Sequence, residues 1–218
     1  MNKQLVNTPE VLITAGGTRE SIDDVRYLGN FSAGRFGHAL AGAYANLGHS
    51  VLLLAPNIAV ERFGLPHGVE HQDFTSADSL RTRILAVPAA RLILHAAAVA
   101  DYTPERVEGK ISSDRDELVV HLHRVPKILP DLREHFGESS EIVGFKLLSG
   151  VTDPELIDAA VKQMATSRTD KCIANDLQEL KQSRRLHVVA PNGDYETLEG
   201  ETQAIAYDVA SIIKIKNL

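Results

Sequence analysis

The chain has one cysteine, Cys172, and no tryptophan among its 218 residues. A single thiol excludes an internal disulfide and a cluster of thiolate metal ligands, which favours a reducing compartment. The net charge of −6 argues against a general nucleic-acid binder, which would carry a basic excess. No window approaches the ~20 apolar residues of a membrane span. We therefore expect a cytoplasmic protein that binds neither nucleic acid nor membrane.

Several nucleotide-binding patterns are absent as well. The apolar run over 11–13 leads into Gly16-Gly17-Thr18 rather than G-x-G-x-x-G, and the next apolar run, 51–54, is not followed by an acidic residue. The P-loop pattern G-x-x-x-x-G-K-[ST] does not occur, and no tyrosine has a lysine four positions later. These absences weaken the alternative of an NAD(P)-dependent reductase.

What is present is an alternation of apolar strand patterns and helical patterns. Strands are predicted over 11–13, 51–54, 92–98, 118–122, 142–147 and 171–174, helices over 33–47, 77–87, 127–136, 154–167 and 202–213, and a hairpin over 186–198. This order predicts a single α/β domain over 1–218. We expect a Rossmann-like, doubly wound, mostly parallel sheet with helices on both faces and a β-hairpin near the C-terminus.

Two glycine-containing segments near the N-terminus are suited to hold phosphate. Gly16 and Gly17 follow the first strand, and 32–37 opens the first long helix, where backbone N–H groups can approach an anion. Asn30 or Ser32 can cap that helix, or the Asn30 amide can donate to a developing oxyanion. Arg26 can pair with a phosphate or carboxylate, or form a surface salt bridge. A nucleotide is the first ligand to consider.

Two later segments add to this site. The small residues Ala96, Ala97 and Ala98 end a predicted strand, where open α/β sheets bind ligands, and close packing of a helix on the sheet is the alternative explanation. The segment 101–116 is rich in charge, proline and glycine, which predicts an exposed loop of the kind that covers active sites.

Taken in order, the motifs of the chain resemble those of a known family. They are TAGGT at 14–18, VRY at 25–27, NFSAGRFG at 30–37, AAVAD at 97–101, KISS at 110–113, GFKL at 144–147 and AND at 174–176. The resemblance, from Val11 to about Ile213, is to the phosphopantothenoylcysteine synthetases. It implies a phosphopantothenate–cysteine ligase of coenzyme A biosynthesis, which activates 4'-phosphopantothenate as an acyl-nucleotide and then forms the amide with cysteine.

The resemblance also implies roles for individual residues. Asn30 would handle the acyl-nucleotide, Lys110 would neutralise charge on the α-phosphate and the departing pyrophosphate, and Arg26 would bind a phosphate or carboxylate. The implied binding residues are Gly16, Ser32, Gly34, Gly37, Ala97, Ala98, Asp101, Lys127, Phe145 and Asn175. Mg²⁺ is implied by the triphosphate chemistry, with no metal-ligating residue assigned in the chain.

The nucleotide stays open at this point. Bifunctional members that use CTP carry lysines where this chain has Gln163 and Ser167, so CTP, ATP and UTP are all candidates. No flavin-dependent half precedes Val11, so a monofunctional type is expected. Because the family is usually dimeric, a homodimer is expected, with 101–116 reaching towards the partner. A non-catalytic nucleotide-binding regulator is the second alternative.

Overall fold

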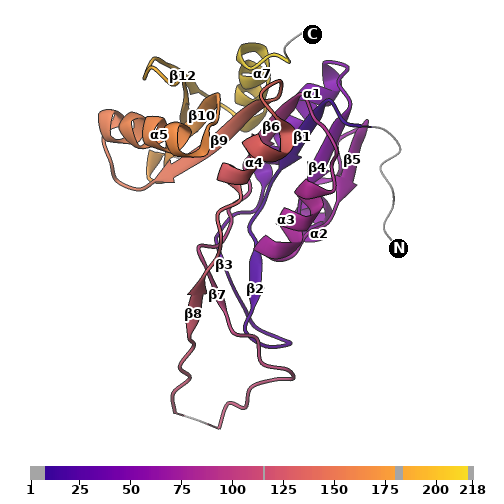
Figure 1. Cartoon of the computed structure of the whole chain (residues 1–218), viewed down its shortest axis with the longest axis vertical. Helices are drawn as coiled ribbons and strands as arrows, with labels where there is room; N and C mark the ends of the chain where they lie inside the picture. Colours follow the sequence, from indigo (N-terminus) through magenta and orange to yellow (C-terminus); the bar gives the residue numbers. More distant parts are fainter. Residues whose placement is uncertain (1–7, 115, 180–183, 216–218) are drawn as a thin grey trace.

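The computed structural model describes residues 8–114, 116–179 and 184–215, and its centre is an eight-stranded sheet (Figure 1). The strands are β1 (Val11–Thr14), β4 (Val51–Leu54), β5 (Val69–Gln72), β6 (Leu92–His95), β9 (Glu141–Leu148), β10 (Lys171–Asp176), β11 (Arg185–Val189) and β12 (Tyr195–Glu199). Their order is β12-β11-β10-β9-β6-β1-β4-β5. In this spatial order, all neighbouring strands between β10 and β5 pair in parallel. The strands β11 and β12 form a hairpin that joins the sheet antiparallel to β10. The predicted fold class is confirmed.

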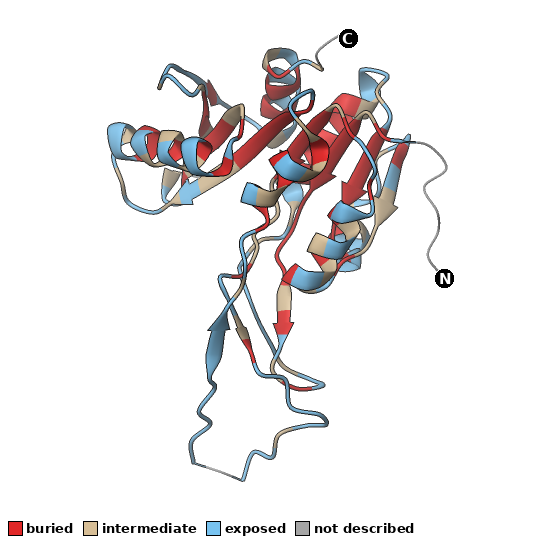
Figure 2. Ribbon diagram, in the orientation of Figure 1, coloured by how far each residue is buried: buried red, intermediate tan, exposed pale blue. Residues whose placement is uncertain are grey.

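Helices cover both faces of the sheet. They are α1 (Arg35–Asn46), α2 (Asn57–Phe63), α3 (Ala77–Leu85), α4 (Leu129–Phe136), α5 (Asp153–Ser167) and α7 (Thr202–Ile212). The helices α1 and α7 pack on one face, and α3, α4 and α5 pack on the other. Because both faces are covered, the central strands are buried along their length, as the red strands of Figure 2 show.

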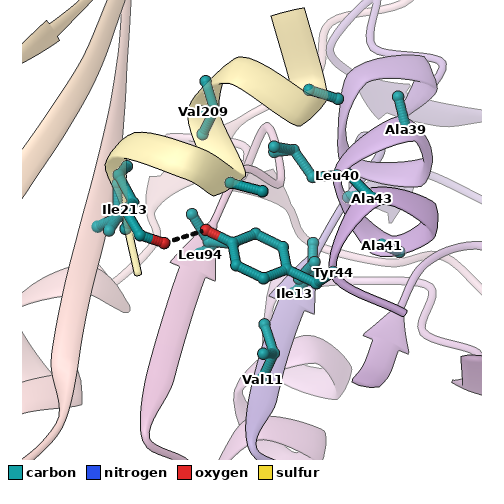
Figure 3. Packing of buried hydrophobic residues seen from close by; sticks show 14 of the residues in the cluster. Val11, Ile13, Ala39, Leu40, Ala41, Ala43, Tyr44, Leu94, Val209 and Ile213 are labelled. Atoms are coloured by element: carbon teal, nitrogen blue, oxygen red, sulfur yellow. Dashed lines mark hydrogen bonds between the residues drawn. The ribbon is translucent and has the colours of Figure 1, made fainter. Parts of the chain in front are cut away.

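Tyr44 marks the centre of the larger core cluster. Its ring lies among Ile13, Leu40 and Leu94, between α1, α7 and the sheet (Figure 3). Its hydroxyl donates a hydrogen bond of 2.7 Å to the carbonyl oxygen of Ile213. Burial raises the pKa of this hydroxyl, so it stays protonated and ties the end of α7 to α1.

The topology fixes where ligands can bind. From β1 the chain crosses through α1 to β4 on one side and later returns to β6 on the other, which makes β1 and β6 the switch point of the sheet. Thr14 pairs in register with both Leu54 and His95, so the three strands end at the same level. The loops that follow them leave the sheet together at its carboxyl edge.

A narrow arm extends from this edge (Figure 1). It is built from the antiparallel pair β2 (Arg19–Ser21) and β3 (Tyr27–Gly29) and the antiparallel pair β7 (Tyr102–Pro104) and β8 (Leu122–Arg124). The strand predicted over 118–122 is therefore wrong, since regular pairing begins only at Leu122. Its apolar pattern mimics a core strand, but Val119 is 64% exposed because the segment runs along the arm. The described part of 101–116 is largely exposed, as predicted.

The start of α1 also differs from the prediction. Gly34 precedes the helix with a φ of +79°, and no side chain caps it, so neither Asn30 nor Ser32 is the cap. A Cβ on Gly34 would lie 2.9 Å from the Gly16 nitrogen, so this turn requires glycine on two counts. The strand predicted over 92–98 ends at His95, although the chain continues beside β1 through backbone bonds. The elements α2, β2, β3, β5 and β7 were not predicted.

Gly37 allows α1 to lie close to β1. A Cβ on Gly37 would come within 2.4 Å of the Ala15 Cβ. We expect Gly37→Ala to lower the free energy of unfolding by about 1–3 kcal/mol, the usual cost of overpacking. In the same helix, a Cβ on Gly42 would lie an ordinary 3.5 Å from Pro66. Gly42→Ala should therefore raise stability by up to about 1 kcal/mol through helix propensity. The free energies of unfolding of both variants, measured in urea, test the prediction. The same change in stability for Gly37→Ala and Gly42→Ala would contradict it.

Candidate active site

Two cavities open at the carboxyl edge of the sheet. The first has a volume of about 370 Å³ and is lined by Gly16, Gly17, Thr18, Arg19, Tyr27, Asn30, Phe31, Ser32, Ala33, Pro56, Ile58, Ala59 and Arg62. The second has a volume of about 150 Å³ and is lined by His95, Ala97, Val99, Ala100, Asp101, Pro126, Lys127, Ile128, Leu129, Phe145 and Gln163. The loops after β1 and β4 form much of the first cavity, and those after β6 and β8 form much of the second.

Asn30 lies between the two cavities. It lines the first, while its Nδ2 donates hydrogen bonds of 3.4 Å and 3.3 Å to the carbonyl oxygens of Ala98 and Val99. Val99 in turn lines the second cavity. The side chain therefore acts as a donor across the switch point, to two backbone carbonyls, and not as a helix cap.

Backbone hydrogen bonds lock the two loops together. The Ala98 N–H donates to the Gly16 carbonyl at 2.8 Å, and the Ala98 carbonyl accepts from the Thr18 N–H at 3.2 Å. The Gly17 N–H donates to the Ser32 carbonyl at 3.1 Å. The backbone N–H and carbonyl groups of Ala98 are both used in these bonds, and Ala98 lines neither cavity. The loops are thus rigidly positioned before any ligand arrives.

The residues predicted to cradle phosphate separate into two groups. Gly16 and Ser32 line the first cavity, whereas Gly34 and Gly37 do not. The last two instead permit close packing of α1 against the first loop and β1. Their contribution to the site is to position the segment that carries Ser32.

The second cavity brings four predicted residues together, namely Ala97, Asp101, Lys127 and Phe145. Asp101 and Lys127 form an ion pair at its rim, where both side chains are 61% exposed. The Phe145 ring packs edge-on against Phe36, with centroids 6.3 Å apart. Asn175 lines neither of these two cavities.

Two further side chains line the second cavity: His95, which was not predicted, and Gln163, which the sequence analysis compared with a lysine of CTP-using members but did not assign to the site. The His95 Nδ1 lies 3.0 Å from the Thr14 hydroxyl, which accepts the Ala97 N–H at 3.1 Å, and burial lowers the pKa of His95 to about 4. The imidazole is therefore neutral. Gln163 donates to the Phe145 carbonyl at 3.3 Å. The only signal for His95 was its place directly before the alanines of the strand end.

Arg26 and Lys110 lie on the arm and line neither cavity. The Asp23 carboxylate joins them: it accepts the backbone N–H groups of Val25, Arg26 and Ile111 and pairs with the Arg26 guanidinium at 2.5 Å. Burial raises the pKa of Asp23, but these hydrogen bonds outweigh burial and lower it to about 2. Asp23 is thus ionised at neutral pH and holds the Lys110 segment against the turn between β2 and β3.

The model of the DNA/pantothenate metabolism flavoprotein C-terminal domain matches residues 6–215. The chain belongs to this family.

Its relatives include the Coenzyme A biosynthesis bifunctional protein CoaBC of Methanocaldococcus jannaschii, 36% identical over 172 residues, and that of Bacillus subtilis, 34% identical over 171. The matches cover 78% and 77% of this chain but 41% and 40% of those relatives. The chain thus spans about two fifths of the length of the curated relatives it matches.

Solved structures of family members share the fold. The DNA/pantothenate metabolism flavoprotein from Streptococcus pneumoniae superimposes with a TM-score of 0.83 and 27% identity, covering 94% of this chain and 97% of that one. The C-terminal domain of a CoaBC protein gives 0.75 and 26%, covering 93% and 92%.

Two further features of this family member bear on its chemistry. Within residues 8–114, 116–179 and 184–215, no group of three or more histidine, cysteine, aspartate or glutamate side chains could hold a metal ion. None of the helices in the described part of the chain is long and apolar enough to cross a bilayer. The first cavity presents two arginines, Arg19 and Arg62, beside the Asn30 amide, a set suited to anionic ligands.

Proposed function

We propose that the chain is a phosphopantothenate–cysteine ligase of coenzyme A biosynthesis. The observation that carries the proposal is Asn30, whose amide stands between two cavities at the switch point of the sheet. The choice of reaction is supported by membership of the family of the DNA/pantothenate metabolism flavoprotein C-terminal domain. It is also supported by relatives named as coenzyme A biosynthesis proteins.

The reaction would proceed in two steps. The carboxylate of 4'-phosphopantothenate attacks the α-phosphate of a nucleoside triphosphate, so that pyrophosphate leaves and an acyl-nucleotide forms. The amine of cysteine then attacks the acyl carbon, and the nucleoside monophosphate leaves as the amide forms. Mg²⁺ would enter bound to the triphosphate, since no metal cage occurs among the described residues.

The chain's own residues would bind and orient these groups. Gly16 and Ser32, on the wall of the first cavity, would hold phosphoryl oxygens through N–H and O–H donors. Asn30 would exchange one of its two carbonyl acceptors for the oxyanion that develops beside the cavity wall. The second cavity, with Ala97, Asp101 and Lys127, would take the nucleoside of CTP, ATP or UTP.

We also propose a homodimer in which the arm serves the partner's site. The arm exposes large apolar side chains that a lone chain would leave in water: Val25, Tyr27, Leu28, Tyr102, Val107, Leu118, Val119, Val120 and Leu122. The same arm carries Arg26 and Lys110, which line neither cavity of their own chain. Packing of the arm against a second copy would cover the apolar surface and deliver both cations.

Pyrophosphate release tests the proposal directly. The protein is mixed with 4'-phosphopantothenate, cysteine and CTP, ATP or UTP in turn, with Mg²⁺ present. We expect release that depends on the acid substrate and that one triphosphate supports best. Tight NADPH binding without any triphosphate turnover would instead identify a reductase, and triphosphate binding without turnover would identify a regulator.

A further inference from the structure

The first cavity carries positive charge that nothing in its wall neutralises. Arg19, from β2, and Arg62, from α2, both line it, and none of its lining residues is acidic. In the described part of the chain no carboxylate forms an ion pair with either guanidinium. The second cavity differs, since its lysine and aspartate neutralise each other.

Aromatic rings hold these guanidinium groups in place. The Arg19 Cζ lies 5.2 Å from the centroid of the Tyr27 ring, and the Arg62 Cζ lies 5.4 Å from that of Phe63. The Arg35 Cζ lies 5.5 Å from the same Phe63 ring. Stacking orients a guanidinium without neutralising its charge.

The remaining wall indicates the chemical class of the anion. Ser32 adds a hydroxyl to this wall, while Pro56, Ile58 and Ala59 make the side next to Arg62 apolar. A planar guanidinium matches the oxygens of a phosphoryl group in bidentate fashion. The cavity is therefore suited to a ligand with a phosphoryl group at one end and an apolar portion beside it.

We propose that Arg62 binds a phosphoryl group of a substrate in the first cavity and makes the protein specific for phosphorylated ligands. The inference rests on the proposed ligase function and adds a residue from α2, which no motif of the sequence marks. Two substrates of that reaction carry the required chemistry, namely the acid with its phosphate ester and the nucleoside triphosphate.

Arg62→Gln separates these two sources. The KM for 4'-phosphopantothenate, the KM for the triphosphate and the inhibition constant of unphosphorylated pantothenate are measured for the variant and the parent. If Arg62 binds the phosphate ester, the first KM should rise about tenfold or more while the pantothenate constant stays the same. If Arg62 binds the triphosphate, only the triphosphate KM should rise. In both cases kcat should change little.

Two controls accompany the variant. Arg62→Lys keeps the charge and should recover part of the lost affinity, and Lys214→Gln removes an exposed charge after α7 and should change nothing. The buried residue of α2 is Ala59, so the substitution of Arg62 should leave thermal unfolding unaltered. The proposal is overturned if both KM values stay within twofold of the parent. It is equally overturned if all constants, including the KM for cysteine, worsen together.

Failure of the ligase function would look different. In that case the parent protein itself releases no pyrophosphate with any triphosphate. Calorimetric titration of parent and Arg62→Gln with inorganic pyrophosphate then decides the matter for Arg62. Binding that weakens about tenfold in the variant supports the proposal, and equal or absent binding in both proteins refutes it.

Discussion

Asn30→Asp is expected to reduce turnover at least about 10²-fold while triphosphate binding changes only a few-fold. The Asn30 amide donates to two carbonyl oxygens, Ala98 O and Val99 O, and faces the first cavity. A carboxylate of the same shape has no N–H to donate. Its charge would repel both carbonyls and any oxyanion that develops beside them. The substitution removes stabilisation that matters most in the transition state and leaves the backbone phosphate contacts unchanged.

Three measurements test this prediction. Titration calorimetry gives triphosphate affinity, single-turnover kinetics separate pyrophosphate release from amide formation, and mass spectrometry detects an accumulated acyl-nucleotide. Asn30→Ala serves as the control, because it removes the donors without adding charge. Asn30 is exposed, so both variants should unfold close to the parent temperature. A parent-like rate in either variant would remove Asn30 from the mechanism.

Lys110→Ala is also expected to reduce turnover at least about 10²-fold, the scale of one lost contact to transition-state charge. The lysine side chain is exposed, while its neighbours are fixed: the Gly109 carbonyl accepts the Asp24 N–H, the Gly109 N–H donates to the Asp24 carboxylate, and the Ile111 N–H donates to the Asp23 carboxylate. The arm therefore presents Lys110 from a defined backbone position. Because the side chain is exposed, the variant should keep the parent's stability, which circular dichroism during heating checks.

Mixed dimers reveal which subunit Lys110 serves. Asn30→Asp and Lys110→Ala chains are each nearly inactive, and they are co-expressed in equal amounts. If the arm acts across a two-fold interface, half of the dimers are mixed and each holds one intact site, so about a quarter of parent activity should return. No recovery, with dimers present, would place Lys110 in the site of its own chain.

Sequence patterns predicted the core strands well because burial leaves a strong signal there. Val11–Ile13, Val51–Leu54 and the apolar part of β10 are continuous apolar runs, as expected for parallel strands covered on both faces. The same rule failed on 118–122, where Leu118, Val119 and Val120 form an equally apolar run that lies exposed on the arm. A pattern records that side chains are apolar, but not which surface covers them.

The site was only partly predictable, for a related reason. Motifs located Asn30 and the glycine loops, but the direction of the Asn30 amide depends on carbonyls some 70 residues away in the chain. Gly37 looked like a phosphate residue and instead permits packing against Ala15. Arg62 carried no motif at all, because α2 reaches the cavity only through the crossover from β4. Long-range placement of this kind is not encoded in local spacing.

The shortness of α2 has a consequence for how the molecule can change. The helix contributes one buried side chain, Ala59, so its other positions can vary at little cost to folding. Yet Ile58 and Arg62 form part of the wall of the first cavity. The glycine loop and the segment that carries Ser32 form another part, and backbone hydrogen bonds join them. One side of the cavity wall is thus fixed by backbone hydrogen bonds, and the other carries side chains that can be replaced at little cost to folding. A library randomised at Ile58 and Arg62 is the most direct route to variants that accept acids of different shape or charge.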